Sequence, residues 1–266
     1  MQVVGVVGAD ETNVQALADD LVPALAERGD VATVRQDEGA PSAVDERATE
    51  THRLGSDGQE AVVRADRDLD AILEDLAPRA DYAVLVGFPE ADVPTVALGD
   101  ADHGGETLVA ADGPSAVDVD EVVAAVEEAE PLETLASLVA TVEEAPGEAF
   151  SGAIATFTGR VRAREDESDV RTEFLEFEKY DGVAESKMDG IRRDIEARDG
   201  VYAVEVAHKT GVVPAGEHVV HVVVLAGHRA QAFSAVQDGI NRLKAEVPLF
   251  KKEVTVDDEF WAHQRE

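Results

Sequence analysis

Apolar and polar positions in the first half of the chain follow a strand, helix, strand rhythm. Within one amphipathic segment, Leu17, Leu21 and Leu25 recur at four-residue spacing, which marks one face of a helix, and Gly29 then ends it. The predicted elements are strands at residues 3–8, 31–35 and 82–87 and helices at residues 12–28 and 67–76. Strands that alternate with helices in this way predict an α/β domain with a parallel sheet.

The second half of the chain has a different pattern. The predicted elements are strands at residues 152–161, 172–177, 202–209 and 218–226 and helices at residues 183–197 and 230–246. In the last helix, Phe233, Val236, Ile240 and Leu243 are expected on the buried face, and Pro248 prevents the helix from continuing. Neighbouring strands with segregated helices predict an α+β domain.

The composition is strongly acidic. The 266 residues include 57 Asp and Glu against 23 Lys and Arg, a formal net charge of −34. This charge excludes general nucleic-acid binding through the bulk surface and disfavours anionic membranes. An acidic, lysine-poor surface is typical of proteins that work in very high salt, where the Debye length falls to about 3 Å at 1 M. We therefore expect a halophilic protein, with an acidic protein of ordinary salt tolerance as the alternative.

A charged run that ends in a proline, residues 127–131, predicts a boundary between two domains, residues 1–128 and residues 131–266. Positive charge is concentrated in the second domain. Divided after residue 130, the chain has 7 basic and 31 acidic residues in the first part and 16 and 26 in the second. Anion chemistry is therefore expected in the second domain.

Other features limit the compartment and the chemistry. The chain has no cysteine, which excludes disulfides, thiolate metal sites and thiol catalysis. No apolar run approaches the ~20 residues of a membrane span, and the N-terminus lacks a secretory pattern. The histidines show no ligand spacing supported by acids. We expect a cytoplasmic protein with no membrane association, no metal site and no cofactor.

The turn after the first strand has the position of a phosphate-binding loop. A working loop ends in Gly-Lys-Ser/Thr, because the lysine meets the phosphates and the hydroxyl ligates magnesium. Here Asn13, Val14 and Gln15 stand in those places. Gly8, Thr12 and Asn13 are the candidate nucleotide-binding residues of a degenerate loop. An acidic strand-to-helix turn is the favoured interpretation over a nucleotide site.

Two further segments of the first domain carry a family resemblance. ETHRLGSDG at residues 50–58 and VLVGFP at residues 84–89 look like segments of the molybdopterin-guanine dinucleotide biosynthesis protein B family, over about residues 1–128. The resemblance implies a P-loop GTPase-like fold. Because the positions that carry the family's chemistry are largely replaced, we expect a relict or adaptor domain.

Basic residues form four groups in the second domain. They are Arg160 with Arg162 at the end of a strand, His228 with Arg229 where a strand passes into a helix, Lys244 with Lys251 and Lys252 around Pro248, and Arg265 near the C-terminus. The second group, His228 with Arg229, lies at the start of a helix, where free backbone N–H groups favour anions. A cationic cluster in so acidic a chain predicts anion binding or nucleophile activation.

The order of these groups resembles the catalytic large subunit of molybdopterin synthase over about residues 131–266. The matching segments are ATFTGRVR at residues 155–162, LEFEKY at 175–180, HKTG at 208–211, GHRAQAF at 227–233, the lysine segment at 242–253 and FW at 260–261. The resemblance implies the α+β fold of that subunit. It also implies conversion of cyclic pyranopterin monophosphate to molybdopterin, by two sulfur insertions that make a dithiolene.

The resemblance implies partners as well. The sulfur donor is the C-terminal thiocarboxylate of a small ubiquitin-like carrier with a Gly-Gly tail, and a homodimer with two carriers forms a heterotetramer. Lys244 and Lys251 match the catalytic lysines. The implied substrate-binding residues are Arg160, Arg162, His228, Arg229, Lys252, Glu253 and Arg265, of which Arg265 approaches the site from the neighbouring subunit.

Two other functions stay open at this point. The chain could be a nucleotide-binding adaptor in molybdopterin-guanine dinucleotide assembly, with the second domain only docking a partner. Lysines such as Lys244 could instead accept covalent attachment of the carrier. The intact lysine segment beside a degenerate phosphate loop favours the sulfurtransferase.

Overall fold

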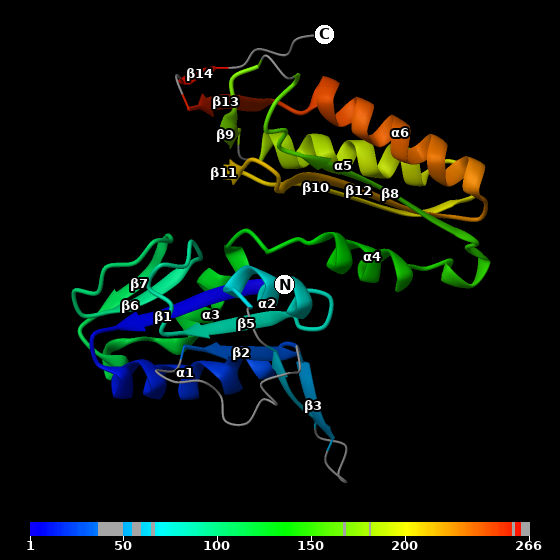
Figure 1. Ribbon diagram of the computed structural model, residues 1–266. Helices are drawn as coiled ribbons and strands as arrows, with labels where there is room; N and C mark the ends of the chain where they lie inside the picture. Colours follow the sequence, from blue (N-terminus) through cyan, green and yellow to red (C-terminus); the bar gives the residue numbers. More distant parts are fainter. Residues whose placement is uncertain are drawn as a thin grey trace. The chain divides into compact units, whose positions relative to one another are not determined.

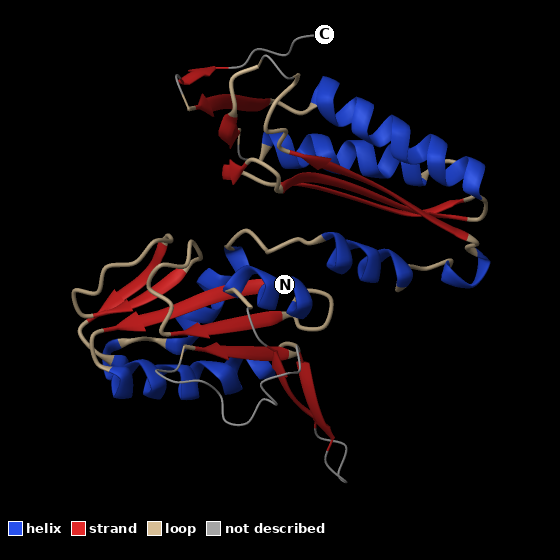
Figure 2. Ribbon diagram, viewed as in Figure 1, coloured by secondary structure: helices blue, strands red, loops and turns tan. Residues whose placement is uncertain are grey.

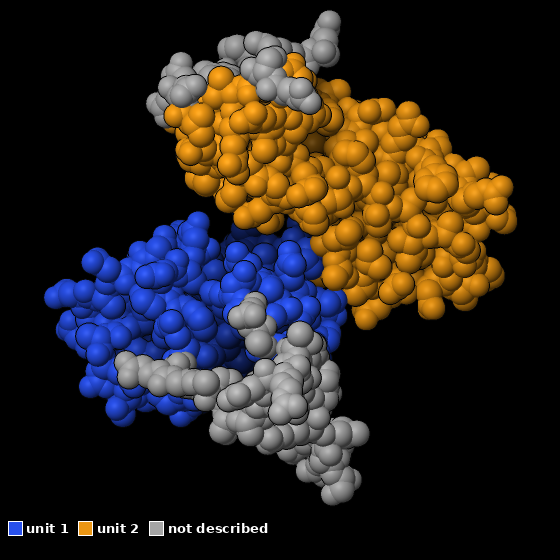
Figure 3. Space-filling model, viewed as in Figure 1, with its two compact units in different colours: residues 1–134 blue, residues 135–266 orange. Residues whose placement is uncertain are grey.

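The structure is a computed structural model of the chain. It describes residues 1–36, 50–54, 60–64, 67–166, 169–180, 182–256 and 259–261. The chain divides into two compact units, residues 1–134 and residues 135–266, drawn in blue and orange in Figure 3. Each unit is described by itself below.

Unit 1 is built on a five-stranded parallel sheet (Figure 1). Its strands, in spatial order, are β2 (Val31–Arg35), β5 (Tyr82–Val86), β1 (Gln2–Gly8), β6 (Thr95–Leu98) and β7 (Thr107–Ala111). β1 and β5 are buried along nearly their whole length. A continuous apolar strand is typical of a parallel sheet that is covered on both faces.

Helices cover both faces of this sheet. They are α1 (Glu11–Ala26), α2 (Leu69–Leu76) and α3 (Val119–Glu128). Unit 1 also contains a short 3-10 helix, η1 (Pro114–Ala116), and a hairpin of β3 (Glu50–Leu54) and β4 (Glu60–Arg64). Val4 and Val6 of β1 pack with α1 and α3, whereas Val3 packs with Leu73 of α2. Alternate side chains of one strand therefore enter two separate cores.

The prediction of a parallel α/β unit is confirmed, and β2 matches its predicted bounds.

Residues 129–134 belong to unit 1, because Met1 and Leu132 exchange backbone hydrogen bonds. The Leu132 N–H donates to the Met1 oxygen at 2.9 Å, and the Met1 amino group donates to the Leu132 oxygen at 3.3 Å.

Unit 2 has a layered α+β arrangement, as predicted (Figure 2). An antiparallel sheet contains β10 (Val201–His208), β12 (His218–Ala226) and β8 (Ala153–Arg160) in that order. The helices α5 (Val183–Glu196) and α6 (Arg229–Glu246) cover one face, and α4 (Leu135–Glu143) packs on the other. A 3-10 helix, η2 (Glu148–Phe150), precedes β8.

A second antiparallel sheet lies at one end of the first. Its order is β11 (Gly211–Pro214), β9 (Thr172–Lys179), β13 (Leu249–Thr255) and β14 (Glu259–Trp261). β13 begins three residues after α6 ends, because Pro248 cannot continue the helical hydrogen bonding. The C-terminal end of α6 is thereby fixed beside this sheet.

One core prediction is wrong. Phe233 is 66% exposed, although it was expected on the buried face of α6. The face that packs on the sheet consists of Ala232, Ala235, Val236, Gly239, Ile240 and Leu243. Small residues at 232, 235 and 239 let the helix approach the strands closely, and a Cβ on Gly239 would lie 2.9 Å from a Val222 methyl group. Phe233 follows Ala232 by one residue and is rotated away from this face.

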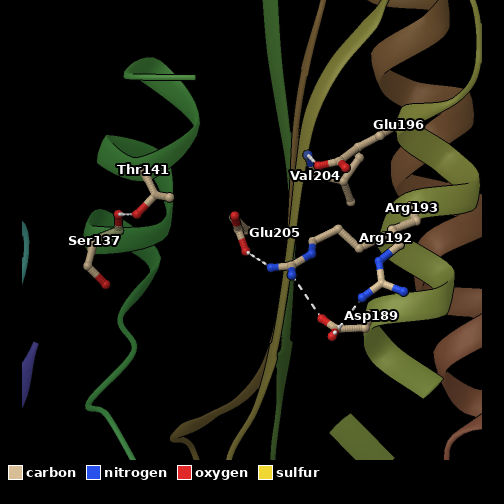
Figure 4. Close-up of polar contacts among 8 residues, drawn as sticks. All are labelled: Ser137, Thr141, Asp189, Arg192, Arg193, Glu196, Val204 and Glu205. Carbon is tan, nitrogen blue, oxygen red and sulfur yellow. Dashed lines mark hydrogen bonds and ion pairs between the residues drawn. The ribbon is translucent and has the colours of Figure 1, made fainter. Parts of the chain in front are cut away.

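The edge strand β10 is capped by side chains of α5 (Figure 4). The Val204 N–H donates to the Glu196 carboxylate at 3.0 Å, so an otherwise unpaired edge group has a partner. Arg192 donates to Glu205 at 3.1 Å and to Asp189 at 2.8 Å, which joins the helix to the strand. Burial is the largest influence on Glu205 and raises its pKa, while Arg192 opposes that shift. Side-chain caps of this kind block edge-to-edge pairing.

Candidate functional site

Arg160 is the last residue of β8, where the strand reaches the second sheet. Its Nε donates to the Gly216 oxygen at 2.8 Å, which holds the exposed guanidinium against the turn before β12. Arg162 lies just beyond the strand and pairs with Glu165 at 3.5 Å, both side chains being largely exposed. Buried Val161 separates the two arginines, so both stand on the solvent side of the chain.

Lys251 and Lys252 are neighbours on β13 and point to opposite faces of its sheet. Lys251 is opposite Phe177 in the register with β9, and Lys252 is opposite Glu176. Lys252 forms an ion pair with Glu176 at 3.8 Å. Lys251 is on the same face as buried Phe177, because neighbouring residues of a strand point to opposite faces. Lys251 therefore lies on the side of the sheet that meets the core of unit 2.

Glu253, the remaining candidate of β13, accepts a hydrogen bond from the Thr172 hydroxyl. It is opposite Leu175 in the register and is thus on the same face as Lys251. Its carboxylate is committed to a contact within the sheet, which fits a supporting role better than a direct one.

Lys244 lies in the last turn of α6 and is exposed. Its neighbours Leu243 and Val247 are buried in the main core of unit 2, so the backbone that carries the lysine is well anchored. A cation at a helix C-terminus is stabilised by the helix dipole. The lysine is therefore carried by an anchored backbone at the end of the helix.

His228 and Arg229 begin the same helix at its other end. His228 occupies the N-cap position with extended backbone (φ −141°, ψ 151°), and the first turn contains no acidic residue. Both side chains are exposed. The first backbone N–H groups of α6, together with a histidine and an arginine, form a place that favours an anion.

The predicted basic groups do not all gather within one chain. Ala226, just before His228, is paired with Ala153 at the start of β8, whereas Arg160 ends that strand. At about 3.3 Å per residue, these ends are about 23 Å apart. α6 runs back along the sheet, so Lys244 lies at the Arg160 end and His228 and Arg229 lie at the opposite end (Figure 1). Within one chain, the structure places Lys244, Lys251 and Arg160 at one end of the sheet, away from His228 and Arg229.

Two residues beside Lys251 were not among the predicted site residues. Lys179 of β9 is only 11% exposed and forms an ion pair with Glu185 at 3.3 Å. His208, at the end of β10, packs edge-to-face on Phe177 with ring centroids 4.9 Å apart. Burial is the main cause that lowers the pKa of His208, and the nearby Lys179 lowers it further. The LEFEKY segment contained Lys179, but only the register shows that it neighbours Lys251.

The candidate phosphate loop of unit 1 is short. Only Ala9 and Asp10 separate β1 from α1, and the Asp10 carboxylate accepts hydrogen bonds from the Thr12 and Asn13 N–H groups at 2.8 and 3.1 Å. An anion of the protein itself thus occupies the helix N-terminus. Gly8 is tightly packed, since a Cβ there would lie 3.0 Å from a Val14 methyl group.

The remaining expectations from the sequence concern Arg265, metal-binding groups and membrane-spanning helices. Arg265 lies outside the described residues. Within the described ranges, no three His, Asp or Glu side chains are grouped so that they could hold a metal ion. The described helices include none with the length and apolar character needed to cross a membrane.

Comparison with known proteins gives matches across the chain. The family described as MoaE protein matches residues 127–246. A probable molybdopterin synthase of Haloferax volcanii is 50% identical over 270 residues, covering all of both chains. A crystal structure of molybdopterin synthase from Staphylococcus aureus covers 51% of this chain and 93% of that one, with 32% identity and a TM-score of 0.44.

A crystal structure of a MobB protein homolog from Bacillus stearothermophilus also matches. It covers 48% of this chain and 100% of that one, with 21% identity and a TM-score of 0.38.

Proposed function

This chain belongs to the molybdopterin synthase family, which acts in molybdenum cofactor biosynthesis, and from that membership we propose that it is the catalytic subunit that inserts sulfur into cyclic pyranopterin monophosphate. The donor is the C-terminal thiocarboxylate of a small ubiquitin-like carrier. In each transfer a carbon–sulfur bond forms on the pterin side chain and a carbon–oxygen bond of that side chain breaks, its oxygen leaving as water or with the phosphate. Water then hydrolyses the acyl carbon–sulfur bond to the carrier, so that the sulfur stays on the pterin and the carrier leaves as a carboxylate.

A sulfur donor in trans suits the composition of the chain. With no cysteine, the protein cannot carry sulfur as a persulfide or a thiolate. The sulfur must therefore arrive on a partner, and its acceptor must be held by groups other than thiols. Lysine and arginine side chains meet this need, because substrate and donor are both anionic.

The observation that carries the proposal is the shared location of Lys244, Lys251 and Arg160 at one end of unit 2. We assign acid–base steps at the pterin side chain to Lys244, whose amine can accept and return a proton when it is neutral. Lys251 stabilises the anionic substrate or intermediate. Arg160 and Arg162 bind the phosphate, since a guanidinium offers forked donors.

His228 and Arg229 support an active site that is shared between two copies of the chain. They lie about 23 Å from Arg160 along one sheet and cannot reach the same small substrate within one chain. In a homodimer, the α6 start of one subunit can complete the lysine end of the other. Two strongly exposed aromatic residues, Phe150 and Phe233, flank that helix start and suit an interface. Two carriers on such a dimer make a heterotetramer.

Production of molybdopterin from purified components tests the proposal. The protein is mixed in high salt with cyclic pyranopterin monophosphate and the thiocarboxylated carrier, and product is compared for wild type, Lys244→Ala and Lys187→Ala. Lys187 is an exposed lysine of α5 and serves as a matched control. Product that requires Lys244 but not Lys187 supports the assignment. A folded wild-type protein that binds the carrier and forms no product overturns it.

A further inference from the structure

The two edges of the three-stranded sheet of unit 2 differ in how they are covered. At one edge, the Val204 N–H of β10 donates to the Glu196 carboxylate at 3.0 Å. At the other edge, β8 has a strand neighbour on one side only, β12, among the strands that the structure describes. Alternate N–H and C=O groups of an antiparallel strand point away from its neighbour, so β8 presents a row of them. Such a row is a template for pairing with another strand.

One face of β8 is open as well as its edge. α4 packs on the face of the sheet opposite α6, and the core that it forms there contains residues of β10 and β12. Ala155 points into the core under α6, so Ile154 and Thr156 point to the α4 face. Ile154 is 38% exposed, and Thr156 is exposed as well. β-branched residues on an open strand favour pairing.

The side of α6 that faces away from α5 lies over this edge. α5 packs on β10, whereas α6 packs on β12 and β8. Arg242 of α6 pairs with Asp194 of α5 at 3.0 Å, which marks the α5 side of the helix. Phe233, nine residues earlier, lies about 180° around the helix from Arg242, and Lys244 lies about 20° from Phe233. Phe233 and Lys244 therefore stand on the outer side of α6, above the edge of β8.

This surface contains no acid, although the chain is strongly acidic. The 57 Asp and Glu residues make most surfaces of two copies repel each other. The eight residues of β8 include one charge, Arg160, which is positive. The acids of α6 are Asp238 and Glu246, and they pair with Arg198 and Arg242 rather than standing beside Phe233. Two copies of the chain can therefore approach each other closely here.

We propose that β8, together with the Phe233 and Lys244 side of α6, binds a second copy of the chain by antiparallel pairing of the two β8 strands across a two-fold axis. The proposal names the interface of the homodimer, and the ligand of the resulting site rests on the proposed function. A strand pairs antiparallel with its own copy about an axis perpendicular to the sheet. The two sheets become one sheet of six strands, and the helices of both copies cover the same face.

The spacing of the helices fits this arrangement. Because α6 packs on β12 and β8, the two α6 helices lie about two strand spacings apart, about 10 Å. Helices in contact are usually about 8–10 Å apart. The two helices run antiparallel, and each Phe233 packs against the α6 of the other copy. The dimer thus buries an aromatic side chain that is 66% exposed in the single chain.

The pairing also joins the divided basic residues. Within one chain, Arg160 and the end of β12 that leads to His228 are about 23 Å apart. Because the two β8 strands run in opposite directions, Arg160 of one copy lies beside the start of β8 of the other. Two strand spacings, about 10 Å, then separate Arg160 from the end of β12 of the second copy. Arg160 and Lys244 of one copy thereby meet His228 and Arg229 of the other.

Disulfide formation across the axis tests the pairing, because the full chain has no other cysteine. Full overlap of the two β8 strands places Thr156 or Phe157 on the axis. Thr156→Cys should form a covalent dimer by itself in the first case. The double variant Thr156→Cys with Thr158→Cys should form one in both cases, because opposite residues of paired strands lie within disulfide range.

Ser186→Cys, at an exposed position of α5, is the matched control and should stay a single chain on a denaturing gel. The samples are oxidised in high salt, and the native mass is measured in parallel. Absence of a covalent dimer from the double variant, when its native mass is that of a dimer, would overturn the pairing. A native mass of one chain for the wild type would overturn it as well.

Phe233→Asp tests the contact between the helices. The new carboxylate stands at an exposed position of the single chain, whereas in the dimer two of them lie between the α6 helices. The dissociation constant of the dimer, measured by sedimentation, should rise about thirtyfold or more, the scale of an aromatic anchor in an interface. Val183→Asp, at an exposed apolar residue of α5, should leave it unchanged. An unchanged constant for Phe233→Asp would contradict the arrangement.

The interface and the proposed function fail separately in these tests. A wild type that forms the β8 disulfide dimer and yields no molybdopterin would contradict only the proposed function. A wild type that yields molybdopterin, with a double variant that forms no covalent dimer, would contradict only the interface. When both are correct, Phe233→Asp diluted to single chains should lose most of its product formation, because Arg160 then lacks His228 and Arg229 of the second copy.

Discussion

Arg160 and His228 lie at opposite ends of one three-stranded antiparallel sheet. Arg160 ends β8, and His228 follows the end of β12, which runs in the reverse direction beside it. The helix α6 then returns along the sheet and carries Lys244 to the Arg160 end. This path divides the basic residues into two groups, and a single pterin-sized ligand cannot touch both in one chain.

Mixing two inactive variants should restore activity if the site is shared between subunits. One variant carries Arg160→Ala with Lys251→Ala, and the other carries His228→Ala with Arg229→Ala. A mixed dimer has one site in which both groups are wild type, so random assortment should recover roughly a quarter of the wild-type rate. Each variant re-mixed with itself is the control. Continued inactivity of mixed dimers of proven composition would place the whole site within one chain.

GTP should not stabilise the protein. The Asp10 carboxylate occupies the N–H groups of Thr12 and Asn13, and a two-residue turn leaves little backbone to surround phosphates. A ligand present at a hundred times its Kd would stabilise the folded state by about 2.7 kcal/mol. Thermal unfolding with GTP and Mg²⁺, compared with salt of equal ionic strength, measures this. A clear rise in Tm would restore the nucleotide-binding adaptor as a candidate.

The Glu196 cap should protect the edge of β10. Glu196→Ala leaves the Val204 N–H without its carboxylate partner, and the exchange of that amide with solvent deuterium should become about tenfold faster, the scale of one charge-assisted hydrogen bond. Glu196→Gln retains an acceptor and should change the rate much less. Equal protection of Val204 in all three proteins would show that the cap contributes nothing to the edge.

His221 should make the folded state sensitive to mild acid. It is buried, its Nδ1 is 3.1 Å from the Thr158 hydroxyl, and burial, with smaller effects from His218 and Lys209, lowers its pKa to about 4. As the pH falls below 6.5, His221 of the unfolded chain therefore binds a proton, whereas His221 of the folded chain stays neutral until the pH approaches about 4. The stabilising contribution is complete above pH 6.5 and declines as the pH falls towards 4.

Between pH 7 and pH 5, the loss of this stabilising contribution should amount to on the order of 2 kcal/mol. The free energy of unfolding, measured by denaturant between pH 7 and pH 5, should fall more steeply for wild type than for His221→Gln. Parallel curves for the two proteins would rule out this histidine as a source of acid sensitivity.

The local pattern predicted both fold classes because the spacing of apolar residues in the sequence reflects which face of each helix or strand is buried. Leu17, Leu21 and Leu25 are fully buried on one face of α1, as their spacing indicated. α3 had the same signal, with Asp118 as its cap and Val119, Val122, Val123 and Val126 on one side, and was nevertheless missed. The short strands β6 and β7 have too few residues to show a period of two.

The candidate site needed information that no local pattern contains. Which residues oppose Lys251 is decided by the pairing of β13 with β9, and these strands are separated by two helices and three strands in the sequence. Phe233 was assigned to the core by its apolar character, but the small residues of α6 determine which face approaches the sheet. Lys179 likewise depends on burial, which arises from tertiary packing.

The fate of the carrier's sulfur tests the central claim most directly. Carrier with an intact thiocarboxylate is incubated with the enzyme and cyclic pyranopterin monophosphate, and mass spectrometry follows its tail while molybdopterin is quantified. The account predicts that two carriers change from thiocarboxylate to carboxylate for each molybdopterin formed, and that neither change occurs with Lys244→Ala. Molybdopterin formed with the carrier tail unchanged, or at an undiminished rate with Lys244→Ala, would contradict it.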